Sequence, residues 1–219
     1  MKYSKEAKLA GSSILMLLMC SGPAIAQSCD VTEFRPEFGE EYLTAQEQFI
    51  VDDNAAAALK ILDSMRQRAA QNASSLNGYE EGAVLGLRSQ VKLDLGDNLG
   101  AIEDLRAYID IGHADSTARL NVMKAVWQLY FQENHLQEGL TYADRWMSAG
   151  GQPVRDEMWT FAIAYNGVAD YSSALLWAER VLELDGTGAE NDVLKFVSFL
   201  YSKTDQPEKQ AEINKRISE

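Results

Sequence analysis

One spaced pair of residues recurs along the chain: a small residue preceded nine positions earlier by an aromatic one. The clear pairs are Phe49 with Ala58, Tyr130 with Gly139, and Tyr165 with Ala174. A further copy has Ala101 but carries Lys92 at the aromatic place, and a weaker fifth copy has Tyr201 with Gln210 at the small place. The small residues at 58, 101, 139 and 174 are 43, 38 and 35 residues apart. Spacings of this length predict an array of repeats.

A polar turn lies between the aromatic position and the small-residue position of every copy. The turns are Asp53-Asn54, Gly96-Asp97-Asn98, Glu133-Asn134, Ala169-Asp170 and Thr204-Asp205. Asn and Asp side chains accept hydrogen bonds from the free amides at a helix start, so each turn is expected to end one helix and cap the next. Because the connections are short, the two helices must run antiparallel.

The small residue falls about one turn into the second helix, where Ala or Gly lets two helix backbones approach closely. Apolar residues then continue at helical spacing, as in Leu140, Ala143 and Trp146. A single hairpin cannot bury such a stripe, so neighbouring hairpins must stack. With 46% hydrophobic residues and only 4 prolines, the chain can supply both long helices and a packed core.

This pattern resembles the tetratricopeptide repeat family. In the clearest copy, Ala162, Tyr165, Tyr171 and Ala174 match the family's signature places, whereas Ala178 stands where the family usually has an aromatic residue. The resemblance implies an all-α fold, a right-handed superhelix of about five antiparallel helical hairpins over residues 38–219. It also implies that the chain binds proteins or extended peptides and has no catalytic residues, no cofactor and no metal.

The first 26 residues have the layout of a cleavable secretory signal. Its parts are a basic start at Lys2, Lys5 and Lys8, an apolar run from Ile14 to Met19, and the small-x-small site Ala24-Ile25-Ala26. Cleavage after Ala26 would leave a flexible mature N-terminus at 27–37 and no membrane span; an uncleaved anchor is the alternative. Lipidation at Cys20 is a further, disfavoured alternative, because lipoprotein sites have a small residue before the cysteine and Met19 is large. Cys29 would then be the only cysteine, either unpaired or in an intermolecular disulfide.

Charge and motifs exclude several classes of function. The formal net charge is −13, and no run of Lys or Arg offsets it, which disfavours nucleic acids and anionic membranes as partners. The chain has no Gly-rich phosphate loop and no nucleophile elbow. His113, His135 and Cys29 do not form a metal-site spacing. The pairs Asp52-Asp53 and Glu80-Glu81 adjoin expected turns or helix starts, where carboxylates favour the helix dipole.

In a superhelix of hairpins, the first helices line the concave face, and residues away from the stacking seam become candidate contacts. The predicted partner-binding residues are Glu47, Gln90, Lys124, Gln128, Phe131, Trp159, Ile163, Asn166, Lys195 and Phe199. Aromatic residues are common interaction anchors, and Gln or Asn can bond to an extended backbone. For Phe131, Trp159 and Phe199, placement in the core is the alternative.

The second half carries a narrower resemblance in Leu129–Glu133, Tyr142–Trp146 and Ala162–Tyr165. These stretches are similar to secreted repeat proteins of Gram-negative bacteria that are found with TonB-type energy-transduction systems. The resemblance implies a periplasmic scaffold that is an accessory of a TonB-type or outer-membrane transport complex. A peptidoglycan- or carbohydrate-associated envelope adaptor is the alternative.

Overall fold

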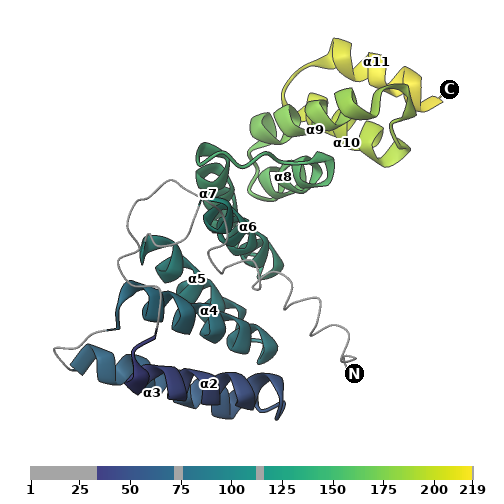
Figure 1. Cartoon of the computed structure of the whole chain (residues 1–219). Coiled ribbons are helices and arrows are strands. Elements are labelled where there is room, and N and C mark those ends of the chain that lie inside the picture. Colours follow the sequence, from purple (N-terminus) through teal and green to yellow (C-terminus); the bar gives the residue numbers. More distant parts are fainter. Residues whose placement is uncertain (1–33, 72–75, 112–115, 219) are drawn as a thin grey trace. The chain divides into compact units, whose positions relative to one another are not determined.

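The computed structural model describes residues 34–71, 76–111 and 116–218, and every regular element in them is helical (Figure 1). The predicted signal segment and Cys29 lie outside the described residues. The helices are α2 (Pro36–Ile50), α3 (Ala55–Gln71), α4 (Gly78–Asp94), α5 (Asn98–Ile111), α6 (Ser116–Gln132), α7 (Leu136–Ser148), α8 (Arg155–Gly167), α9 (Tyr171–Asp185), the 3₁₀ turn η2 (Gly186–Gly188), α10 (Asn191–Lys203) and α11 (Pro207–Ser218). The predicted all-α hairpin fold is confirmed.

The chain forms two compact units, the first ending at Leu129 and the second beginning at Tyr130. In the first unit, α2 packs on α3, α3 on α4 and α4 on α5, and α2 also touches α4. In the second unit, α8 packs on α7 and α9, and α10 packs on α9 and α11. Each unit is therefore a stack of helical hairpins in which alternate helices run parallel.

The predicted turns coincide with the backbone positions that reverse the chain. Residues Gly96, Asp53, Asn134, Ala169 and Asp205 all have positive φ, between 55° and 79°. The next helix is then capped by a side chain: Asp97 accepts from the Gly100 amide at 2.9 Å and Asp170 from the Ser173 amide at 3.0 Å. At the α2–α3, α4–α5 and α8–α9 turns, one left-handed residue is thus followed by a capping side chain. The predicted cap is wrong at the α6–α7 turn, where Asn134 is left-handed and the next residue, His135, caps α7 with no side-chain hydrogen bond.

The small residues occupy the helix crossings, as the sequence predicts. Ala58, Ala101 and Ala174 are fully buried, and Gly139 is buried as well. A methyl group on Gly139 would overlap the ring of Phe131, so a larger residue here would force that ring to move. The repeated spacing therefore reflects the need for a small residue where the two helices of a hairpin cross.

An ion pair with a buried carboxylate fixes the start of the first unit. The Arg35 guanidinium donates to Glu80, with Nη2 2.6 Å from Oε2, and the Arg35 backbone amide donates to Oε1 at 2.8 Å. Glu80 also accepts from the Asn77 amide at 2.9 Å and closes the N-terminus of α4. The first helix accordingly starts at Pro36, two residues before the expected boundary at 38.

Within the described ranges, no helix is long and apolar enough to cross a bilayer.

Candidate functional site: an aromatic face on the second unit

Four aromatic rings from three helices of the second unit form a continuous row. The Trp159 ring on α8 meets Phe196 on α10 edge-on, with ring centroids 5.1 Å apart. Phe196 stacks on Phe199 at 6.4 Å, and Phe199 meets Tyr171 of α9 at 6.2 Å. Helices α8 and α10 are the first helices of successive hairpins, so the row crosses from one repeat to the next.

This row is partly open to solvent. Phe199 is 41% exposed, although its neighbours Ser198 and Leu200 are buried. Ile163, one helical turn after Trp159, is 49% exposed and extends the apolar surface along α8. Trp159, Tyr171 and Phe196 are half-buried. We refer to Trp159, Ile163, Tyr171, Phe196 and Phe199 as the aromatic face.

Cations border the aromatic face at its α10 side. The Lys203 ammonium lies 5.4 Å from the Phe199 ring centroid and 5.6 Å from that of Tyr171, within the range of a cation–π interaction. Lys195 is exposed, with its Nζ 3.7 Å from a carboxylate oxygen of Asp192. The face therefore combines apolar anchors with positive charge on a protein that is acidic overall.

Asn166 adds an unused acceptor on the α8 side. Its Oδ1 is buried and accepts no hydrogen bond within the described part of the chain. Asn166 follows Ile163 by three residues, so the two side chains lie on the same side of α8. A buried acceptor without a donor costs free energy, so this amide is a locally unfavourable feature of α8 beside the aromatic face.

The structure brings together five of the ten predicted contacts in the second unit: Trp159, Ile163, Asn166, Lys195 and Phe199. Phe131 also lies in this unit, but it packs against Phe161 with ring centroids 6.3 Å apart and against Gly139. The Phe131 ring is half-buried and lies against neighbouring helices of the second unit. The other four predicted residues belong to the first unit: Glu47 and Gln128 are exposed, whereas Gln90 and Lys124 are half-buried.

Sequence reasoning missed Phe196 and Lys203 as members of this surface. Phe196 precedes Phe199 by three residues, and Lys203 follows it by four, so both lie beside Phe199 on α10. That helical spacing was the available signal. The contact of Phe196 with Trp159 could not be read in the same way, because it depends on how α8 and α10 pack.

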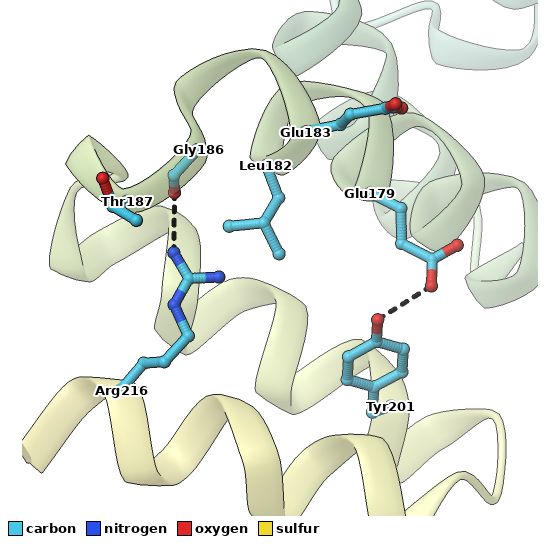
Figure 2. Close-up of a pocket in the computed structure, with 7 residues that line it drawn as sticks. All are labelled: Glu179, Leu182, Glu183, Gly186, Thr187, Tyr201 and Arg216. Carbon is cyan, nitrogen blue, oxygen red and sulfur yellow. Dashed lines mark hydrogen bonds between the residues drawn. The ribbon is translucent and has the colours of Figure 1, made fainter.

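A separate pocket lies between α9, η2, α10 and α11, with a volume of about 430 Å³ (Figure 2). It is lined by Glu179, Leu182, Glu183, Gly186, Thr187, Tyr201 and Arg216. Two hydrogen bonds join residues of its lining: the Tyr201 hydroxyl donates to Glu179 at 2.8 Å, and Arg216 Nη2 donates to the Gly186 carbonyl at 2.7 Å.

The electrostatics of this pocket suit packing better than catalysis. Burial, together with the adjacent Glu179 carboxylate, raises the pKa of Tyr201, so its hydroxyl stays protonated and donating. The same carboxylate lies 3.2 Å from the Lys209 ammonium. Across the described residues, no three His, Cys, Asp or Glu side chains gather in a way that could hold a metal ion.

Comparisons with known proteins identify the fold. No family model and no curated protein matches the sequence. Among solved structures, a MamA protein aligns with a TM-score of 0.53 at 12% identity, over 84% of this chain and 91% of its own. YrrB, described as a tetratricopeptide protein with an unusual peptide-binding site, aligns at 0.52 and 14% identity, over 83% and 87%. MamA from Desulfovibrio magneticus RS-1 aligns at 0.50 and 11% identity, over 85% and 96%. The chain has a tetratricopeptide-like fold.

Proposed function

We propose that this protein is a non-catalytic interaction scaffold whose aromatic face binds an extended segment of a partner protein. The observation that carries the proposal is the row Trp159–Phe196–Phe199–Tyr171, which spans two repeats and leaves Phe199 open to solvent. Large aromatic side chains in a contiguous patch are the residues that anchor protein interfaces.

The chemistry around the row favours a peptide. Ile163 and Phe199 offer apolar contact, and the Lys195 and Lys203 ammonium groups can attract carboxylates of a bound peptide. The rings of the row meet mostly edge to face and occupy one another's surfaces, which leaves little flat ring surface for a sugar to stack on. The peptide-binding description of YrrB, a protein of similar fold, is consistent with this reading.

The proposed location is the periplasm, reached through the signal at residues 1–26, with cleavage after Ala26. The proposed partner class is the TonB-type energy-transduction or outer-membrane transport machinery. The support is the resemblance of the second half to secreted repeat proteins found with such systems, and this is the half that carries the aromatic face. An envelope extract is therefore the source in which to look for partners.

The test is selection of peptides from a displayed random library on the purified mature chain. A double variant, Ile163→Ser with Phe199→Ser, removes the two most exposed apolar side chains of the aromatic face. Leu176→Ser is the matched control, because Leu176 on α9 is 50% exposed and outside that face. We expect selected peptides to bind the wild type and the control equally, and the double variant at least tenfold more weakly, since each lost anchor is worth about 1.5 kcal/mol.

Three outcomes would contradict parts of the proposal. Equal binding by the double variant would remove the aromatic face from the interaction. Binding of peptidoglycan fragments, with no peptide selected, would favour the carbohydrate adaptor. Recovery of the same envelope proteins by wild type and double variant, without TonB-type or outer-membrane transport components, would remove the proposed partner class.

A further inference from the structure

The first unit exposes aliphatic side chains at two of its hairpin turns. They are Ile50 and Val51 at the α2–α3 turn, and Leu93, Leu95 and Leu99 at the α4–α5 turn. Each is between 37% and 72% exposed. Large apolar side chains exposed together mark an interaction surface more often than chance. We call these five residues the aliphatic edge.

The Arg35–Glu80 ion pair brings the two turns to the same level. Helices α2 and α4 run parallel and touch each other. Ile50 follows Arg35 by 15 residues, and Leu95 follows Glu80 by 15 residues. With the same rise of about 1.5 Å per residue in both helices, Ile50 and Leu95 end side by side. Packed helix axes lie about 8–10 Å apart, so the two turns are neighbours at one end of the first unit.

The fold does not require aliphatic residues at these turns. The α8–α9 and α10–α11 turns have the same positive φ, at Ala169 and Asp205. Between Gly167 and Asp170, and between Thr204 and Gln206, the structure exposes no large apolar side chain. Hairpins of the same geometry therefore form with small or polar tips, and the aliphatic edge needs an explanation other than folding.

Carboxylates surround the edge. Asp52, Asp53, Asp94 and Asp97 lie in the same two turns, and all four are exposed. The whole chain carries a net charge of −13, which steers cationic partners toward it. An anionic lipid surface would be repelled by the same groups. The edge thus offers apolar contact within a negative rim.

We propose that the aliphatic edge docks a segment of a partner protein in which aliphatic side chains stand beside Lys or Arg. The leucines and Ile50 contact the aliphatic side chains, and the negative charge of the four aspartates attracts the basic ones. This surface belongs to the first unit and is formed independently of the aromatic face. The scaffold would then hold two segments of different chemistry.

The test uses a labelled helical peptide with leucine on one face and lysine on the other, and a twin with glutamate in place of lysine. Fluorescence anisotropy gives the dissociation constant for the full mature chain and its variants. The edge variants are Leu95→Ser with Leu99→Ser, and separately Ile50→Ser with Val51→Ser. The controls are Leu176→Ser and the aromatic-face variant Ile163→Ser with Phe199→Ser. Circular dichroism establishes that each variant keeps its helix content.

We expect the leucine–lysine peptide to bind the wild type and both controls equally, and each edge variant about tenfold more weakly. The glutamate twin should bind at least tenfold more weakly than the lysine peptide, and added salt should narrow that gap. Unchanged binding in both edge variants would overturn the proposal. So would equal binding of the twin, edge-dependent binding to phosphatidylglycerol vesicles in place of the peptide, or edge-dependent dimerisation in the ultracentrifuge. Because the aromatic-face variant is one of the controls, failure of the aliphatic edge to bind can be distinguished from failure of the proposed function.

Discussion

The α4–α5 hairpin of the first unit and the α8–α9 hairpin of the second are built alike and filled differently. In α8–α9, Phe161 and Trp177 meet edge to face, with ring centroids 5.3 Å apart. The equivalent places in α4–α5 are Arg88 and Asp104, whose Nη1 and Oδ1 atoms are 2.8 Å apart. In both hairpins the two residues are 16 positions apart and the second follows the small alanine by three. An ion pair thus replaces an aromatic pair.

The substitution extends beyond one pair. Lys92, at the place that Tyr165 holds in the other hairpin, brings Nζ to 2.9 Å from Asp104 Oδ2 and donates to the Gly100 carbonyl at 3.0 Å. Arg66 of α3 lies 3.5 Å from the same carboxylate. Asp104 is 3% exposed and faces three cations. A single buried carboxylate therefore ties three helices of the first unit together.

The turns and small residues therefore determine the geometry of the hairpin, whereas the side chains packed between its two helices can vary. Aromatic filling gains free energy through buried apolar area. A buried ion cluster must first offset the desolvation of its charges, so it stabilises only while every partner is present. The two hairpins should consequently respond differently to single and to combined substitutions.

The largest effect is expected for Asp104→Leu, which leaves the buried Lys92 cation without its carboxylate and Arg88 with Asp63 as its remaining carboxylate partner. We expect a loss of about 4 kcal/mol in the free energy of unfolding of the first unit. Hydrogen exchange of peptides from 78–111, beside peptides from 155–185, measures each hairpin separately. A loss below about 1 kcal/mol would mean that the cluster contributes little.

Trp177→Ala should cost about 3 kcal/mol, because it removes the ring against Phe161 and opens a cavity in the second unit. Faster exchange is expected in 155–185, with 78–111 unchanged. The same protection in both segments as in the wild type would show that the aromatic pair does not hold α8–α9.

Glu80→Gln should cost about 2 kcal/mol in the first unit, because Glu80 receives hydrogen bonds from Arg35 and Asn77 in a fully buried position. Burial alone would raise the pKa of Glu80, but the hydrogen bonds from Arg35 and Asn77 outweigh it and lower the pKa below the ordinary 4.5. Its stabilisation is therefore present above pH 4.5 and is lost as the pH falls through the lowered folded pKa.

Urea unfolding between about pH 6 and pH 3 tests this sign. The wild type should lose stability at the acid end of the range, and the Glu80→Gln variant should lose less over the same range. Parallel pH profiles for the two proteins would contradict the assignment. Asp185, whose pKa is likewise held down by hydrogen bonds from Arg155, remains in both proteins and serves as the internal control.

The smallest effect is expected for the combined replacement Arg88→Leu, Lys92→Met and Asp104→Leu. With these three charges removed together, the free energy of unfolding should lie within about 1 kcal/mol of the wild type. Apolar residues can replace buried ions at little net cost, because the desolvation of the charges offsets their attraction. A triple variant as unstable as Asp104→Leu alone would show that apolar side chains cannot replace the ion cluster between α4 and α5.

The sequence predicted the hairpins because their turns and small residues depend on local chemistry. Asp53, Asn134 and Asp205 stand where the chain reverses, and Ala58 stands at a crossing. It could not predict contacts made between helices. Arg88 and Asp104 are 16 residues apart and read as surface charges, and Arg35 and Glu80 are 45 residues apart. Half of the proposed contacts gather in the second unit, whereas the role of Phe196 emerges only from packing.

The most direct test of the scaffold is site-specific photo-crosslinking in the cells that make the protein. p-Benzoylphenylalanine is placed at Ile163 in the aromatic face or, as a matched control, at the equally exposed Leu176. We expect a discrete adduct with a partner protein from position 163, suppressed by a library-selected peptide, and no adduct from position 176. No adduct at 163, or the same adducts from both positions, would contradict the assignment of the aromatic face as the partner-binding surface.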